Sequence, residues 1–153
     1  MNKQQKFEIN YTCFETWDDV PENYQQLMKE ARLAKDGSYA PYSNFNVGAA
    51  LLLNNGKIIH GSNQENASYP IGFCAERTAL SAAASLASHE KIKAIAITAK
   101  SAHNPVLTPA APCGICRQTI FAHFANLLST VLIYEENLCC HILDMLSDIL
   151  LLT

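Results

Sequence analysis

Four residues in two short motifs have the types and the spacing to do chemistry together. Cys74 and Glu76 stand in the run Cys-Ala-Glu-Arg-Thr-Ala, and Cys113 and Cys116 stand in Pro-Cys-Gly-Ile-Cys-Arg-Gln. Three thiolates can hold a zinc ion and leave one position of its tetrahedron open for water, whereas a fourth protein ligand would close the site. The neighbouring carboxylate is then free to move protons. The pattern therefore predicts a zinc site that activates water, with Cys74, Cys113 and Cys116 as ligands.

The spacing also predicts where in the fold these residues lie. Cys113 and Cys116 are three positions apart, which places them on one face of a helix, and Pro112 suits a first helical turn. The positive end of that helix would lower the pKa of the thiols. Positions two apart on a helix point in nearly opposite directions, so Cys74 and Glu76 can share a pocket only if Cys74 lies before the first regular turn.

An arginine is the expected partner of this site. Zinc with three thiolates carries a net negative charge, which weakens its effect on water. Arg77 is therefore expected to bond ligand sulfurs and withdraw that charge, with Arg117 as a second candidate; the alternative is a solvated arginine on a helix face. For the cluster as a whole, the alternatives are a structural zinc site or three core cysteines. A structural site would not need Glu76.

Composition limits the class of protein. The chain has 153 residues and a formal net charge of −3, which suits one domain with its own core. Its lysines and arginines are scattered, which argues against a protein that binds nucleic acid by neutralising phosphates, and therefore against an enzyme that edits polynucleotides. No apolar run approaches the roughly 20 residues that span a membrane. The polar start carries no secretory signal, so a cytoplasmic location is expected.

Three of the six cysteines lie outside the two motifs. In a chain of this size without a leader, a Cys-x-x-Cys indicates metal or redox chemistry rather than a disulfide framework. Cys13, Cys139 and Cys140 are expected to be buried or half-buried thiols.

The hydrophobic pattern predicts a mixed sheet with helices on both faces. The tight-turn signal Asn54-Asn55-Gly56 predicts a hairpin between two of its strands. The expected strands are residues 7–13, 45–53, 57–61, 92–98 and 130–134. The expected helices are residues 21–35, 74–89 and 113–127, with a short one at 142–146 and a loop over 101–112.

Four blocks of this sequence resemble the cytidine deaminase family, in its small homotetrameric class with three cysteine ligands. They are residues 39–51 (Tyr-Ala-Pro-Tyr-Ser-Asn-Phe-Asn-Val-Gly-Ala-Ala-Leu), 61–69 (Gly-Ser-Asn-Gln-Glu-Asn-Ala-Ser-Tyr), 74–79 and 112–118. The resemblance implies an α/β fold, a three-layer α/β/α sandwich with a mixed five-stranded sheet and room for an extra N-terminal strand. Residues 1–20 would be an extension and residues 21–153 the catalytic domain.

The resemblance also implies a reaction: zinc-dependent hydrolytic deamination of cytidine and 2′-deoxycytidine to uridine and 2′-deoxyuridine plus ammonia, in pyrimidine salvage. One zinc ion per subunit would acidify the water, and Glu76 would act as base and then as acid, as in zinc deaminases generally. A homotetramer with pockets shared between subunits follows from the same resemblance. The family's substrate-binding residues map to Phe45 against the base, Asn63 and Glu65 at the ribose hydroxyl, the backbone of Ala75 at the pyrimidine edge, and Tyr69 in a neighbouring subunit's pocket.

Some of these assignments have plainer alternatives, and the end of the chain differs from the family. Phe45 could be plain core, and Asn63 and Glu65 could be a solvated strand edge. The family usually ends with Leu-Leu-Pro and a phenylalanine that stacks on the base bound by another subunit, whereas residues 147–153 hold neither a proline nor an aromatic. Two other functions therefore stay open: deamination of another aminopyrimidine nucleoside, of the antibiotic type, and a zinc-stabilised relative with impaired catalysis.

Overall fold

The order of strands in one sheet determines where the two cysteine motifs meet. A computed structural model describes residues 11–102, 111–124, 130–134 and 140–143. Its six strands form a sheet in the order β1-β6-β5-β4-β2-β3. The elements are β1 (Tyr11–Phe14), η1 (Trp17–Asp19), α1 (Glu22–Lys35), β2 (Phe45–Leu53), β3 (Ile58–Ser62), η2 (Tyr69–Ile71), α2 (Ala75–Leu86), β4 (Ile92–Ser101), α3 (Gly114–Phe124), β5 (Thr130–Tyr134) and β6 (Cys140–Leu143), where η marks a short 3₁₀ helix.

Strand directions bring the starts of α2 and α3 to the same edge of the sheet. Both β3 and β4 pair with β2 in the antiparallel sense, so they run parallel to each other. The helix that follows each of them therefore begins at the same edge, as at the carboxyl ends of strands in other α/β sheets. The parallel pairing of β4 with β5 needs a crossover connection, in which α3 lies.

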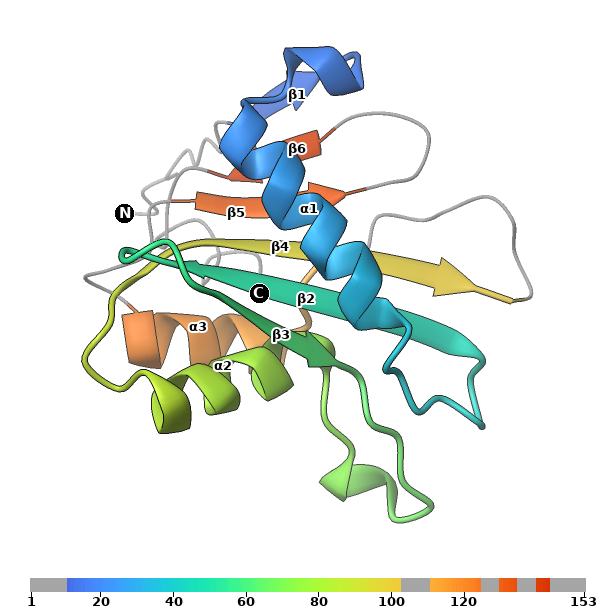
Figure 1. Ribbon diagram of the computed structural model, residues 1–153. Helices are drawn as coiled ribbons and strands as arrows, with labels where there is room; N and C mark the ends of the chain where they lie inside the picture. Colours follow the sequence, from blue (N-terminus) through green and yellow to red (C-terminus); the bar gives the residue numbers. More distant parts are fainter. Residues whose placement is uncertain (1–10, 103–110, 125–129, 135–139, 144–153) are drawn as a thin grey trace, which may run out of the picture.

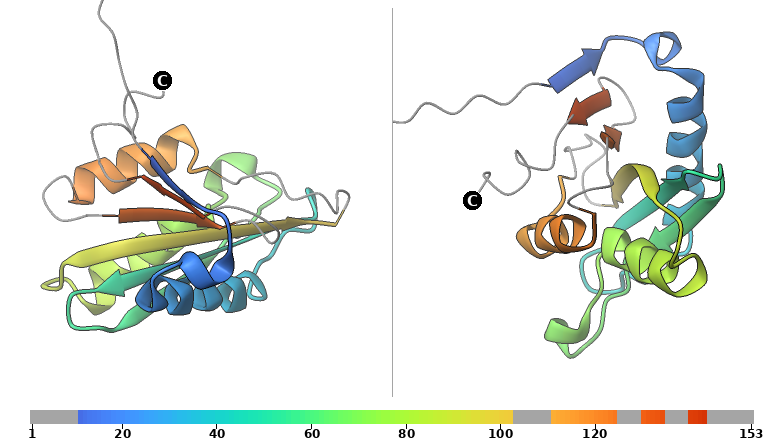
Figure 2. Two further views of the ribbon diagram at one scale, coloured as in Figure 1. Left: turned by 90° about the horizontal axis from the view of Figure 1, so that it is seen from above. Right: turned by 90° about the vertical axis from the view of Figure 1, so that its left-hand side faces the viewer.

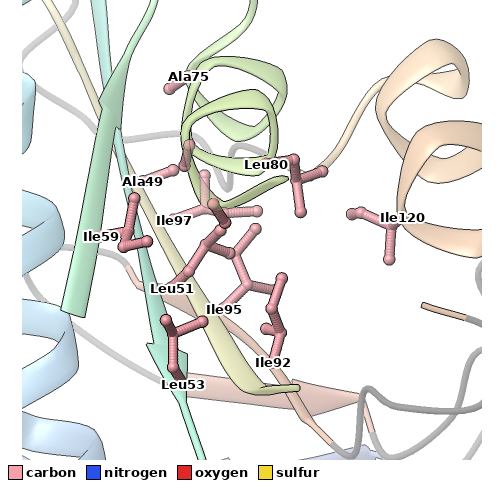
Figure 3. Close-up of a cluster of buried hydrophobic side chains, with 12 residues drawn as sticks. Ala49, Leu51, Leu53, Ile59, Ala75, Leu80, Ile92, Ile95, Ile97 and Ile120 are labelled. Atoms are coloured by element: carbon pink, nitrogen blue, oxygen red, sulfur yellow. The ribbon is translucent and has the colours of Figure 1, made fainter. Parts of the chain in front are cut away.

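Helices cover both faces of the sheet. Figures 1 and 2 show α1 on one face and α2 and α3 on the other. The α1 helix buries Leu27, Met28 and Ala31 against β2 and β4. On the opposite face, apolar side chains of the sheet pack against those of α2 and α3. Figure 3 shows this cluster, with Ala49, Leu51, Leu53, Ile59, Ile92, Ile95 and Ile97 from the sheet, Ala75 and Leu80 from α2, and Ile120 from α3. None of the described helices is long and apolar enough to cross a membrane.

Most of the expected elements are present, but the predicted short helix at residues 142–146 is wrong over its described part. Residues Cys140–Leu143 form β6 instead. This strand pairs antiparallel with β1 on one side and with β5 on the other. Pairing on both sides gives its backbone N–H and C=O groups partners, which outweighs a weak local preference for helix. Residues 144–153 lie outside the described residues.

The N-terminal extension adds an edge strand and is attached to α1. Residues 7–10 of the predicted strand lie outside the described residues, but Tyr11–Phe14 pairs with β6. Phe14 and Trp17 pack against the core beneath α1. Nε2 of Gln25 donates hydrogen bonds to the carbonyl oxygens of Trp17, at 3.1 Å, and Val20, at 2.9 Å. Residues 11–20 of the extension therefore belong to the same sheet and core as the rest of the described fold.

The prediction of a buried or half-buried Cys13 is wrong, because this residue is exposed. Successive side chains of a strand point to opposite faces. Since Phe14 faces the α1 layer, Cys13 points to the other face at the outermost strand. Cys139 and the side chain of Cys140 lie outside what the structure describes.

Gly61 lets α2 approach β3 closely. A Cβ atom at this position would lie 2.4 Å from the carbonyl oxygen of Ala75 and 2.4 Å from the amide nitrogen of Ala79. Both atoms belong to the backbone of α2, so they can move away only if the helix itself shifts. Gly61 therefore fixes the height of α2 above the sheet at the turn where Cys74 and Glu76 lie.

Replacing Gly61 by alanine should destabilise the fold by about 1–3 kcal/mol, because the added methyl group overpacks the contact between β3 and α2. Urea unfolding measures the change. The matched control is Gly114→Ala, since a Cβ there has 3.9 Å to its nearest neighbour, Nη2 of Arg117. This control should leave stability unchanged or raise it, because alanine favours a helix. Equal stabilities of the two variants would contradict the close approach.

Candidate active site

Three thiols gather where α2 and α3 begin. The Sγ atoms of Cys74 and Cys113 lie 3.8 Å apart, and those of Cys113 and Cys116 lie 3.4 Å apart. All three sulfurs lie within 4.8 Å of one another, and this group could hold a metal ion. Zinc–sulfur bonds of about 2.3 Å in a tetrahedron need sulfurs about 3.8 Å apart. The cluster therefore fits zinc, a metal that thiolate ligands favour over magnesium or calcium.

The helix starts place these sulfurs as the geometric argument requires. Cys74 has an extended backbone, with φ of −72° and ψ of 154°, and lies just before the first residue of α2. Cys113 lies just before Gly114, the first residue of α3. Both helices thus begin one residue later than predicted. The first N–H groups of a helix have no partner within it, and their partial positive charge favours thiolates at this end.

Hydrogen bonds within the cluster separate the pKa values of its thiols. The pKa of Cys74 is lowered to about 6, chiefly by a hydrogen bond from Cys116, with further contributions from Cys113 and the charge of Arg77. The pKa of Cys116 is raised, because this thiol holds its proton in the bond to Cys74 and is buried. A metal ion must displace such protons, so metal binding should weaken as pH falls.

Glu76 lies in the first turn of α2 and is buried, with 5% of its surface exposed. Burial raises the pKa of its carboxyl to about 7, and the negative charge on Cys74 adds to the rise, while a hydrogen bond with Cys116 opposes it. That bond also places the carboxyl beside the sulfur cluster. A group whose pKa lies near neutrality can both accept and release a proton at physiological pH.

The burial of Glu76 predicts a pH-dependent stability of the metal-free protein. Folding raises the pKa of this carboxyl from 4.5 to about 7. Below pH 4.5 the carboxyl is protonated in both the folded and the unfolded protein, so its burial costs no stability. As pH rises from 4.5 through 7, the unfolded protein gains by ionising this group and the free energy of unfolding falls, by about 3 kcal/mol in total. Metal-free Glu76→Gln should therefore match the wild type near pH 4.5 and be the more stable protein at about pH 8. Urea unfolding with chelator and reductant measures this; equal stabilities at the higher pH would contradict it.

Arg77 acts on the cluster through its charge. Its guanidinium carbon lies 4.5 Å from the ring centroid of Phe73, and its charge helps to lower the pKa of Cys74. Phe73 directly precedes Cys74, and two backbone hydrogen bonds of 2.8 and 2.9 Å join it to Gln64. The predicted bond from Arg77 to a ligand sulfur stays a prediction. In the first turn of α3, Nε of Arg117 is buried and has no hydrogen-bond partner among the described residues.

Asn63 bonds the first residues of β2, and Glu65 bonds the turn that leads into this strand. Oδ1 of Asn63 accepts a hydrogen bond from the Val47 amide at 2.8 Å, and Nδ2 donates one to the Phe45 carbonyl at 2.9 Å. Oε2 of Glu65 accepts hydrogen bonds from the amides of Tyr42 and Ser43. These side chains are half-buried, so they are not merely a solvated edge.

The other predicted binding residues occupy three different environments. Phe45 is half-buried at the first position of β2. Ala75 is fully buried at the first position of α2, where its N–H has no partner within the helix. Tyr69 is 91% exposed in η2, and Figure 1 shows the segment around η2 projecting from the body of the molecule.

Sequence reasoning missed two residues around the site, Phe73 and Ser43. Phe73 stands four positions before Arg77, a spacing that pairs side chains within a helix, but α2 begins only at Ala75. Because Phe73 lies outside the helix, its four-residue spacing from Arg77 did not predict that the two side chains stack. Ser43 lies inside the block at residues 39–51, where nothing local distinguishes it. Its role depends on Glu65, which is distant in sequence.

The two helix starts, the three thiols and the buried carboxyl together define a class of protein, a metal-dependent hydrolytic enzyme of the α/β type. The family model for the cytidine and deoxycytidylate deaminase zinc-binding region matches residues 21–128. This chain therefore belongs to the cytidine and deoxycytidylate deaminase family.

Individual relatives agree with this assignment. A cytidine deaminase of Halalkalibacterium halodurans is 49% identical over 96 residues, which cover 63% of this chain and 68% of that protein. One of Sporosarcina psychrophila is 42% identical over 114 residues, covering 74% of this chain and 77% of that protein. The crystal structure of cytidine deaminase from Burkholderia pseudomallei matches with a TM-score of 0.69 at 38% identity, covering 82% of this chain and 94% of that one.

Proposed function

We propose that this protein is a zinc-dependent cytidine deaminase, which converts cytidine and 2′-deoxycytidine to uridine and 2′-deoxyuridine with release of ammonia. The observation that carries the proposal is the buried carboxyl of Glu76, hydrogen-bonded within a cluster of three cysteines at two helix starts. Relatives named cytidine deaminase support the choice of substrate. They do not favour the two alternatives, another aminopyrimidine nucleoside or an impaired relative.

In this mechanism, Glu76 carries the protons. When held by Cys74, Cys113 and Cys116, zinc supplies a Lewis acid that lowers the pKa of water from 15.7 towards about 7. Glu76 accepts a proton from the attacking water and passes it to N3 of the pyrimidine ring as the new bond to oxygen forms at C4. It then takes the remaining proton of the added oxygen and delivers it to the amine as the bond between C4 and nitrogen breaks. One water is consumed and one ammonia released.

We propose that the nucleoside binds between the start of β2 and the start of α2. Phe45 would pack against the base, Asn63 and Glu65 would bond the ribose hydroxyl, and the backbone of Ala75 would bind the pyrimidine edge. The side-chain NH₂ group of Asn63 has two N–H donors, and one of them bonds the Phe45 carbonyl. The second donor supports a further hydrogen bond to a ribose hydroxyl. Arg77, stacked on Phe73, would offset the charge of the thiolates.

We further propose a homotetramer with one zinc ion per subunit and shared pockets. The exposed Tyr69 supports this, because an aromatic side chain that projects from the surface suits an interface. Light scattering should give a mass of four chains, and a monomeric mass at working concentrations would contradict the proposal. The need for three reduced thiols supports a cytoplasmic place of action in pyrimidine salvage.

For the fold, we propose that β2 to β6 with helices on both faces are the three-layer, five-stranded core of the family. Residues 1–20 would then be an extension of a catalytic domain that spans residues 21–153. The start of the family match at residue 21 supports this division.

A substrate panel tests the proposed function. Cytidine and 2′-deoxycytidine should be deaminated with similar efficiency, whereas free cytosine should have a kcat/KM at least about 10²-fold lower, because it loses the ribose contacts that position the ring. Deoxycytidylate should also be a poor substrate, because its phosphate would lie in the same pocket as the Glu65 carboxylate. Turnover of deoxycytidylate in preference to cytidine would contradict a nucleoside deaminase.

A further inference from the structure

Glu65 holds the loop that leads into β2. Its Oε2 atom accepts hydrogen bonds from the backbone N–H of Tyr42 at 2.9 Å and of Ser43 at 3.3 Å. The hydroxyl of Ser43 donates a further hydrogen bond to the same carboxylate. Two consecutive N–H groups that converge on one oxygen form a backbone nest, which is a site for an anion. In this loop, the anion is the protein's own glutamate.

Ser43 extends this contact to Phe45. Its hydroxyl oxygen accepts a hydrogen bond from the Phe45 amide at 3.0 Å, while its proton is donated to Glu65. Between them, Asn44 has a φ of 52°, in the left-handed region that asparagine adopts more readily than most residues with a side chain. This conformation turns the chain between the amides that Glu65 binds and the start of β2.

Asn63 holds Phe45 from the other side. Its side chain bonds the Phe45 carbonyl and the Val47 amide, at 2.9 and 2.8 Å. Phe45 is thus bonded at its amide through Ser43 and at its carbonyl through Asn63. Because Phe45 is the proposed wall of the base pocket, the shape of this loop sets the shape of that pocket.

We propose that Glu65 is a positioning residue, whose carboxylate holds residues 42–45 in the shape that accepts the pyrimidine base, independently of any bond to the ribose. Its effect on catalysis rests on the proposed function, but its effect on the loop does not. Hydrogen bonds from the Ser43 hydroxyl and then the Tyr42 amide lower the pKa of the Glu65 carboxyl, which keeps this anchor charged.

A combined change of residue and substrate separates the positioning role from a ribose contact. Glu65→Ala and Ser43→Ala are assayed with cytidine and with 2′,3′-dideoxycytidine, which lacks the 2′- and 3′-hydroxyls of the sugar and keeps only the 5′-hydroxyl. On both substrates, Glu65→Ala should raise KM by roughly tenfold or more and Ser43→Ala by roughly threefold, with smaller changes in kcat. If Glu65 acted only on the ribose, its penalty would disappear on the dideoxynucleoside and Ser43→Ala would be neutral, which would overturn the inference.

Amide hydrogen exchange tests the loop without turnover. In the zinc-loaded protein, the amides of Tyr42, Ser43 and Phe45 should exchange about tenfold faster in Glu65→Ala and measurably faster in Ser43→Ala. The control Glu30→Gln removes a carboxylate that pairs with His60 on the α1 face, and it should leave these amides unchanged. Unchanged exchange in Glu65→Ala would overturn the inference. Failure of the wild type to deaminate cytidine would overturn the proposed function instead, while the exchange result would still decide the role of Glu65 in the loop.

Discussion

Replacing Glu76 by glutamine should lower kcat for cytidine about 10³- to 10⁴-fold or more, with the zinc content unchanged. Glutamine keeps the shape of the side chain but cannot accept and return a proton. The proton transfers from the water, to N3 and to the leaving amine all depend on this carboxylate, so all of them are impaired in the variant. Because only 5% of this residue is exposed, bulk water has little access to replace it. Steady-state kinetics and metal analysis on the same preparation measure both quantities.

The matched control for this change is Glu30→Gln, which makes the same substitution on α1, where the carboxylate pairs with His60 at 2.8 Å. Its kcat should stay within about twofold of the wild type, since changes at the surface away from the site have small effects. A Glu76→Gln variant that keeps zinc and more than a tenth of wild-type kcat would show that another group moves the protons.

Replacing Cys116 by alanine should abolish stable zinc binding and lower cytidine turnover by about 10³-fold or more. Cys116 is fully buried, and its sulfur lies 3.4 Å from that of Cys113. Two thiols cannot enclose zinc as three do, and the lost binding free energy also lowers stability, since metal binding is coupled to folding. Atomic absorption, thermal unfolding with and without added zinc, and turnover measure the three consequences.

Cys13→Ala is the control for this second change, because it removes an exposed thiol of β1 outside the cluster. This variant should retain both zinc and activity. Treating the wild type with a chelator should reproduce the loss of turnover seen in Cys116→Ala. Added zinc should then restore turnover to the wild type but not to Cys116→Ala. Full zinc occupancy in Cys116→Ala would mean that the three-cysteine site is assigned wrongly.

The elements that position the site could be predicted where the signal is local. The apolar run and turn that define β2 and β3 stand together in sequence, and Gly56 has the positive φ, 84°, that such a turn needs. Helix periodicity is also local, so the requirement that Cys74 lie outside regular helix followed from the two-residue spacing to Glu76. The structure confirms it with an extended backbone at Cys74.

Non-local pairing explains what could not be predicted. The β6 strand is specified by its partners β1 and β5, and β1 lies at the far end of the chain. The anchor role of Glu65 depends on a hydrogen bond to Tyr42, 23 positions earlier. A sequence shows that Glu65 follows a strand and is acidic, but only the fold shows which backbone amides its carboxylate meets.

Deamination of cytidine in water enriched in oxygen-18 tests the central claim most directly. The zinc-loaded protein should form uridine that carries one heavy oxygen at C4, with one ammonia released for each uridine, as mass spectrometry and an ammonia assay would show. The same protein after removal of zinc, and Glu76→Gln with zinc, should form almost none. A zinc-loaded wild type that forms no uridine from cytidine, or forms it without the heavy oxygen, would contradict hydrolytic deamination at this site.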